Sequence, residues 1–94
     1  MYLYFDWNEE KANRNWRNHK VSFKEATTVF NDPLSITIGD PEHSIQENRY
    51  IDIGRSSRGR VLVVVYTEKE KVIRIISSRL ATRKEREEYE EGSI

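Results

Sequence analysis

The first third of the chain has the pattern of one short strand followed by two helices. Aromatic residues dominate the partly alternating segment 2–7, which is typical of a strand. Asn8 is a suitable N-cap for a helix that extends to about His19, with its apolar residues on one stripe. Segment 22–25 is a capping box, and the apolar residues that follow at helical spacing predict a core-facing helix that Asp32-Pro33 ends.

The rest of the chain favours strands. We expect strands at 34–38, 49–53, 60–67 and 72–77, with loops or turns at 39–44, 56–59 and 68–71. The third of these is the most apolar strand and is therefore predicted to be central in the sheet. A second capping box at 82–85 opens a short charged helix that extends to about Glu91. The order β-α-α-β-β-β-β-α predicts an α+β fold in which an antiparallel sheet packs against the two N-terminal helices and leaves its other face partly open.

Composition limits the kind of protein this can be. The chain has 94 residues, which predicts a single domain over 1–94. It has no cysteine, so disulfides, thiolate zinc sites and cysteine nucleophiles are excluded. The N-terminus lacks the basic region of a signal peptide, and the longest apolar run, 61–66, is too short to cross a bilayer. We therefore expect a soluble, cytoplasmic protein.

Charge is unevenly distributed although the formal net charge is zero. Segment 55–86 carries ten basic and three acidic residues, and acids elsewhere in the chain balance it. Such a segment attracts polyanions, chiefly nucleic acid. A solvated, salt-bridged surface explains the same composition equally well.

The two histidines are the candidate proton carriers. His43 is predicted to lie in a loop, with Glu47 four residues later, so an imidazole and a carboxylate stand near the end of a strand. A loop histidine is nevertheless more often simply solvated. His19 falls on the apolar stripe of the first helix, where a packed, hydrogen-bonded histidine is the favoured interpretation. Two histidines without suitably spaced partners predict neither a zinc site nor any other metal site, and no cofactor-binding motif is present.

Three arginines are candidates for binding a phosphate. Arg74 stands within an apolar strand, Arg60 opens the central strand, and Arg79 follows the end of the last strand. If the last two strands form a hairpin, Arg60 and Arg79 lie near one edge of the sheet, where guanidinium groups can grip a phosphate bidentately. For each single arginine, an internal salt bridge is the favoured alternative; the candidate acids are Asp6, Asp32, Asp52 and Glu25.

The chain resembles the BrnT toxins along nearly its whole length. The resemblance rests on Phe5-x-Trp7, Lys11, Asn15, His19, Val21-Ser22-Phe23-x-Glu25-Ala26, Phe30-x-Asp32-Pro33, His43-Ser44-x-x-Glu47-x-Arg49, Ile53-Gly54, Ser56, Gly59-Arg60, Val63-Val64, Thr67-Glu68, Ile73-Arg74-Ile75-Ile76-Ser77, Arg79-x-Ala81-Thr82 and Glu85-Arg86-x-x-Tyr89. The chain departs from the usual pattern at Asn8, which replaces an aspartate, and on either side of His19. There Asn18 replaces a lysine and Lys20 a glycine.

The resemblance implies a RelE-like ribonuclease fold and a metal-independent endoribonuclease that cleaves mRNA and arrests translation. It also implies a BrnA-type antitoxin, which forms a heterotetramer with the toxin and binds promoter DNA. We expect the RNA's own 2′-hydroxyl to attack the adjacent phosphorus. His43, or else Glu47, would move the proton, while Arg60, Arg74 and Arg79 hold the phosphate. Weaker candidates for substrate contacts are Lys11, His19 and Arg49. The alternative is a non-catalytic module that binds nucleic acid or a protein partner through the same basic surface.

Overall fold

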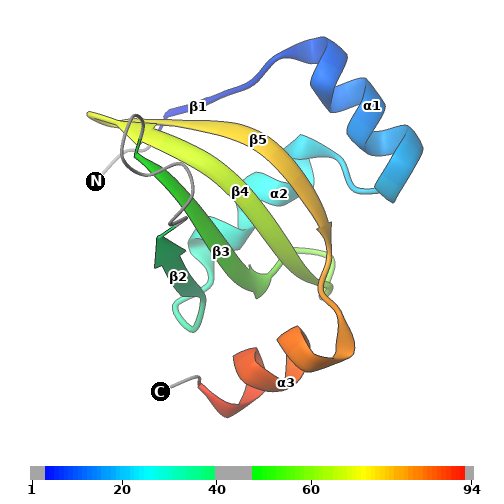
Figure 1. Ribbon diagram of the computed structural model, residues 1–94, viewed down its shortest axis with the longest axis vertical. Coiled ribbons are helices and arrows are strands. Elements are labelled where there is room, and N and C mark those ends of the chain that lie inside the picture. Colours follow the sequence, from blue (N-terminus) through cyan, green and yellow to red (C-terminus); the bar gives the residue numbers. More distant parts are fainter. Residues whose placement is uncertain (1–3, 40–47, 93–94) are drawn as a thin grey trace.

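The computed structural model describes residues 4–39 and 48–92 and has the predicted order of elements (Figure 1). These elements are β1 (Tyr4–Asp6), α1 (Glu9–His19), α2 (Phe23–Thr27), the 3-10 helix η1 (Thr28–Asn31), β2 (Ile36–Gly39), β3 (Arg49–Arg55), β4 (Val61–Lys69), β5 (Val72–Leu80) and α3 (Arg83–Glu91). The three α-helices begin at N-caps whose side chains accept backbone hydrogen bonds: Asn8, Ser22 and Thr82. The predicted α+β class is confirmed.

The strands form one five-stranded sheet in the order β1-β5-β4-β3-β2. The chain from β2 to β5 makes antiparallel pairs and places β4 at the centre, as predicted. However, β1 joins β5 in parallel, so the sheet is mixed. The hairpin between β4 and β5 is also longer than expected, because Glu68 and Lys69 still pair with β5 and only residues 70–71 form the turn.

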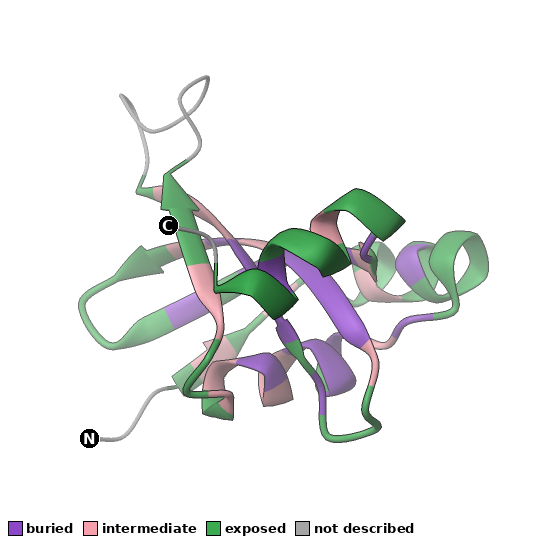
Figure 2. Cartoon of the chain, turned by 90° about the horizontal axis from the view of Figure 1, so that it is seen from below, coloured by how far each residue is buried: buried purple, intermediate pink, exposed green. Residues whose placement is uncertain are grey.

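One face of the sheet is covered by α1, α2 and η1. Leu62 and Val64 point from β4 into this layer and are inaccessible to solvent, as are Val21 and Ala26 from the helical side. Figure 2 shows the result: buried residues gather in α2 and the central strands, whereas α3, the helix that leads to the C-terminus, is largely exposed. The main core therefore lies between the sheet and the N-terminal helices.

Within residues 4–39 and 48–92, only α3 covers the opposite face, and it does so at one end. Tyr89 of α3 is buried against this face, and its hydroxyl donates a hydrogen bond of 2.5 Å to Asp32 Oδ2. The Arg55 guanidinium lies over the Tyr89 ring, 5.7 Å from its centroid. The remainder of this face stays open, as the sequence predicted. Within the described residues, no helix is long and apolar enough to cross a bilayer.

Candidate nucleic-acid interface

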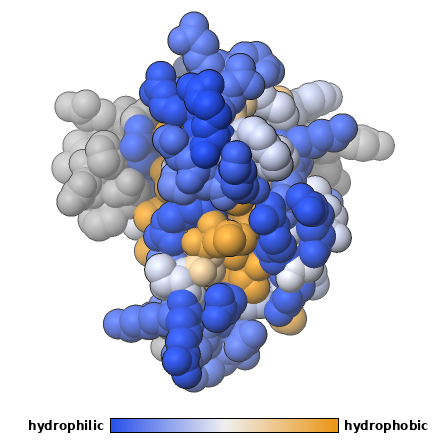
Figure 3. Space-filling model, turned by 90° about the vertical axis from the view of Figure 1, so that its right-hand side faces the viewer, coloured by the Kyte–Doolittle hydropathy of each residue, from blue (hydrophilic) through white to orange (hydrophobic). Residues whose placement is uncertain are grey.

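The open face of the sheet carries a groove of about 590 Å³. Side chains of β2 to β5 form its floor, the end of α1 closes one side, and the start of α3 closes the other; the lining residues are His19, Ile38, Ile51, Ile53, Val63, Val65, Ser77, Ser78, Arg79, Thr82, Lys84, Glu85 and Glu88. Figure 3 shows one side of the molecule with apolar side chains at its centre and hydrophilic side chains around them. The groove thus has an aliphatic floor and a polar rim.

Strand alternation determines which residues reach this groove. Successive residues of a strand point to opposite faces, so Val63 and Val65 face the groove while Leu62 and Val64 enter the core. In the antiparallel register Val63 is opposite Arg79 and Val65 is opposite Ser77. Because residues opposite each other share a face, the alternation of β4 brings Arg79 and Ser77 of β5 into the groove.

His19 is exposed and lines the groove, so the preferred prediction of a packed histidine was wrong. It is the last residue of α1, which ends there because Lys20 adopts a left-handed conformation. Asn15 fixes this end of α1 against β5: its Nδ2 donates to the Ser78 carbonyl at 2.8 Å, and its Oδ1 accepts from the Ser78 amide at 3.1 Å. This buried amide bridge holds the imidazole beside Ser77.

A second hollow of about 250 Å³ continues the groove along α1. His19 and Ser77 line both spaces, and the remaining lining residues are Lys11, Arg14, Asn15, Asn18 and Ile76. The structure therefore brings Lys11 into the same region as His19 and Arg79, and it adds Arg14. A polyanion in the groove would meet cationic side chains on both of its flanks.

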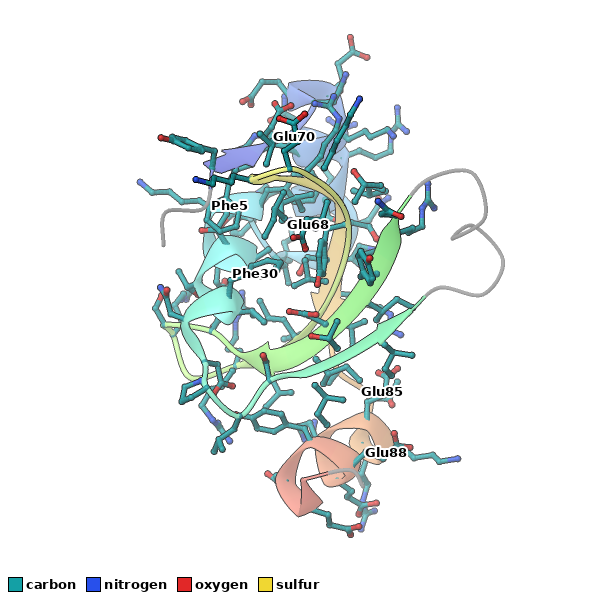
Figure 4. All side chains as sticks on the ribbon, turned by 90° about the vertical axis from the view of Figure 1, so that its left-hand side faces the viewer. Phe5, Phe30, Glu68, Glu70, Glu85 and Glu88 are labelled. Atoms are coloured by element: carbon teal, nitrogen blue, oxygen red, sulfur yellow. The ribbon has the colours of Figure 1, made fainter. Side chains whose placement is uncertain are left out.

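Arg79 lies within β5, because the strand continues to Leu80 and does not end at Ser77 as predicted. Its guanidinium makes a bidentate ion pair with Glu85, with Nη1–Oε1 and Nη2–Oε2 distances of 2.8 and 3.0 Å. This hydrogen bonding lowers the pKa of Glu85 to about 2 and raises the pKa of Arg79. Figure 4 shows Glu85 where α3 meets the sheet, with Glu88 further along the helix.

Arg60 belongs to the covered face and not to the groove. Its Nε donates to Glu25 Oε2 at 3.0 Å, and its Nη2 donates to Glu25 Oε1 and to the Lys20 carbonyl. Glu25 is 6% exposed and also accepts from the Ser56 hydroxyl at 2.7 Å. The hydrogen bond from Arg60 is the main cause of the lowered pKa of Glu25. Arg60 thus has the internal salt bridge that was its favoured alternative.

Arg74 is also remote from the groove. It pairs with Asp6 of the neighbouring strand β1, another of the acids named from the sequence. Arg79 lies five positions after Arg74 in β5, which is roughly 16 Å of extended chain. The predicted convergence of Arg60, Arg74 and Arg79 on one phosphate is therefore wrong, because strand alternation and strand length direct the three guanidiniums to different places.

Three further residues were candidates from the sequence: His43, Glu47 and Arg49. His43 and Glu47 fall outside the described residues. Arg49 opens β3 opposite Thr67 and is half-buried. Among the described residues, no three His, Asp or Glu side chains are grouped so that they could hold a metal ion.

Sequence reasoning missed three polar residues that face these hollows: Arg14, Ser77 and Lys84. Ser77 carried a usable signal, since the pair Ser77-Ser78 interrupts an apolar strand and one of the two must face outward. Arg14 and Lys84 carried none, because exposed basic residues on helices are common and only the packing of each helix decides what they face.

The groove on the open sheet face of this small α+β protein has Arg79 and Lys84 on its rim beside Glu85 and Glu88, and with Lys11 and Arg14 of the adjoining hollow it offers basic contacts for a polyanion. The family model for "Ribonuclease toxin, BrnT, of type II toxin-antitoxin system" matches residues 7–85, so the chain belongs to the BrnT family of ribonuclease toxins. The chain is similar in structure to the Brucella abortus ribonuclease toxin BrnT, solved at 1.1 Å resolution. The TM-score is 0.68 with 16% sequence identity, and the match covers 87% of this chain and 100% of that one. None of the curated protein sequences compared with the chain matches it.

Proposed function

We propose that this chain is a metal-independent endoribonuclease that cleaves mRNA in the groove on the open sheet face and thereby arrests translation. The observation that carries the proposal is the groove itself, where His19 and Arg79 line one space and Lys84 adds a further charge. It offers an imidazole for proton transfer and guanidinium and ammonium groups for phosphate oxygens. The fold would be RelE-like, and residues 1–94 would form one domain.

The chemistry proposed is transesterification. The 2′-hydroxyl of the RNA attacks the adjacent phosphorus, the bond to the 5′-oxygen breaks, and a 2′,3′-cyclic phosphate and a free 5′-hydroxyl result. RNA supplies the nucleophile, so the protein has only to move protons and stabilise the charge that builds on the phosphate. His19 takes or returns a proton, and Arg79 binds the phosphate. His43 and Glu47 remain predictions for the second proton carrier.

Arg79 has donors available for this task beside its ion pair. Guanidinium has five N–H groups, and Glu85 accepts from two of the three nitrogens. Because Glu85 fixes the planar group, a phosphate that approaches the remaining N–H groups finds them already oriented. The pair therefore supports a role for Arg79 in the proposed site and does not exclude it.

The proposed partner is a BrnA-type antitoxin that neutralises the toxin, forms a heterotetramer with it and binds the promoter DNA of the operon. Membership of a family of type II toxins supports an antitoxin partner. We propose a cytoplasmic location because mRNA is the proposed substrate. Co-expression with the neighbouring gene product should restore growth, and the purified complex should contain both chains.

The decisive experiment incubates the purified chain with single-stranded RNA in excess chelator. We expect cleavage that chelation does not reduce, with products ending in 2′,3′-cyclic phosphate. The same sequence made with 2′-deoxyribose should bind and remain intact, because it lacks the nucleophile. Loss of cleavage on chelation would contradict metal independence. Tight binding of RNA without any cleavage would favour the non-catalytic alternative.

A further inference from the structure

A third hollow, of about 260 Å³, lies beside the segment that connects β5 to α3, on the side of that segment away from the groove. It is bounded by the turn between β3 and β4, the end of β5 and the outer side of α3; the lining residues are Arg55, Gly59, Arg60, Val61, Leu80, Ala81, Arg86 and Glu90. The turn is held to this connection, since the Ala81 amide donates to the Val61 carbonyl at 2.9 Å. Figure 1 shows that the β3–β4 turn and the start of α3 lie at the same end of the molecule.

The three hollows follow one another along the second half of β5. The hollow beside α1 reaches Ile76 and Ser77, the groove reaches Ser77 to Arg79, and the third hollow reaches Leu80 and Ala81. Among the described residues, seven basic side chains line this series, against three carboxylates; the basic residues are Lys11, Arg14, Arg55, Arg60, Arg79, Lys84 and Arg86, and the acidic residues are Glu85, Glu88 and Glu90. The chain as a whole is neutral, so positive charge is concentrated along this line.

The arginines of the third hollow differ in how firmly they are held. Arg60 is fixed through Nε and Nη2 by Glu25 and the Lys20 carbonyl. Arg55 donates from Nη1 to the Gly59 carbonyl at 3.0 Å and lies over Tyr89. Each keeps further N–H groups that these contacts do not use. Because both side chains are already ordered, an anion that binds them loses little additional side-chain entropy. Arg86 is exposed, and its side chain makes no hydrogen bond or ion pair with any other described residue.

We propose that this third hollow is a second phosphate-binding site, which holds the RNA backbone beyond the cleavage groove and so extends the substrate interface along β5. The inference rests on the proposed function, because it assumes that RNA occupies the groove. The site contacts phosphate and not bases, so it contributes affinity that depends on salt and on the length of the RNA, without sequence preference.

The test uses charge-reversed variants that carry the same net charge. Arg86→Glu changes the third hollow, whereas Arg83→Glu changes an exposed residue of the same helix that pairs with Glu87 and lines none of the three hollows. Binding is measured over a range of salt concentrations with a long single-stranded oligonucleotide of 2′-O-methyl ribose, which cannot be cleaved, and with a dinucleotide, whose single phosphate can occupy only one of the two sites at a time.

We expect Arg86→Glu to weaken binding of the long probe several-fold more than Arg83→Glu does. It should also lower the slope of log affinity against log salt by about 0.7, the value for one lost phosphate contact on a single strand. Binding of the dinucleotide in the groove should stay unchanged. In the opposite direction, Glu90→Gln should tighten binding of the long probe more than Glu91→Gln, because only Glu90 lines the hollow.

Equal effects of Arg86→Glu and Arg83→Glu would overturn the proposal, since the loss would then reflect only the overall field of the protein. Loss of antitoxin binding in Arg86→Glu without loss of RNA binding would overturn it as well and would assign the surface to the protein partner. These outcomes differ from failure of the proposed function, in which the wild-type chain does not cleave RNA of any length.

Discussion

The two faces of the sheet are formed by alternate residues of the same strands, but their charged side chains differ in exposure and in what they contact. On the face covered by α1 and α2, Arg60 pairs with the buried Glu25, and further hydrogen bonds hold both side chains. On the open face, Arg79 and Glu85 form a similar bidentate pair at the rim of a groove, and the Arg79 side chain is 42% exposed. Both pairs fix an arginine side chain: the Arg79 pair faces the groove, whereas the Arg60 pair anchors the covered face and leaves the unused N–H groups of Arg60 toward the third hollow.

The largest effect is expected on activity at the open face. Arg79→Ala should lower the rate of RNA cleavage by about 10²–10³-fold, since it removes a donor that stabilises charge on the phosphate. Stability should fall by only about 1 kcal/mol, because the lost pair is partly exposed. Cleavage assays and chemical denaturation on the same preparation check both values. Arg83→Ala is the matched control, and wild-type cleavage by Arg79→Ala would refute the role of Arg79.

His19→Ala should lower the cleavage rate by about 10²-fold through loss of proton transfer. The fold should be unaffected, because His19 is exposed and the bridge of Asn15 to β5 does not involve the imidazole. The measurement is the pH dependence of single-turnover cleavage. If the variant keeps the wild-type pH profile and rate, the proton is carried by another residue.

The covered face should respond in stability and not in chemistry. Glu25→Gln removes the charge that Arg60 faces, and we expect a loss of about 2 kcal/mol in the free energy of unfolding. Below its melting temperature the variant should retain wild-type cleavage per folded molecule. Calorimetry together with active-site titration checks this prediction. A variant of unchanged stability but reduced cleavage would place Arg60 in the chemistry after all.

The same valine-to-alanine substitution at two neighbouring positions of β4 allows the packing of the two sheet faces to be compared. Val64 is inaccessible in the core, so Val64→Ala should cost about 2 kcal/mol from lost burial and a residual cavity. Val65 lies half-buried on the groove floor, and Val65→Ala should cost under about 1 kcal/mol while weakening RNA binding. Denaturant unfolding measures both costs. Equal losses would mean that the open face is as well packed as the covered one.

The smallest effect is expected on how the free energy of unfolding changes at low pH, through the Arg79–Glu85 ion pair. The pKa of Glu85 lies near 2 in the folded state, below its ordinary value of 4.5. Its contribution is therefore fully present above about pH 4.5 and is lost as the pH falls towards 2. Because Arg79 is partly exposed, we expect only about 1 kcal/mol. The stability difference between wild type and Glu85→Gln should shrink over this range.

The elements of the fold were predicted from local sequence signals, each of which spans only a few residues. Asn8, Ser22 and Thr82 cap their helices where the sequence predicted, and each predicted strand formed. The predicted end of a strand was less accurate where that end depends on pairing with another strand. The sequence gives no local reason for β5 to continue to Leu80, but β4 supplies partners up to that point.

The element order, the open face and the concentration of positive charge could all be predicted from the chain, because periodicity, capping and composition are local properties. Only the tertiary structure decided which charges meet. Arg60 and Arg79 lie near the same end of the sheet, yet one pairs with Glu25 beneath the helices and the other with Glu85 beside the groove. Their separation follows from the alternation of side chains and from pairings between residues far apart in the sequence, which no local pattern encodes.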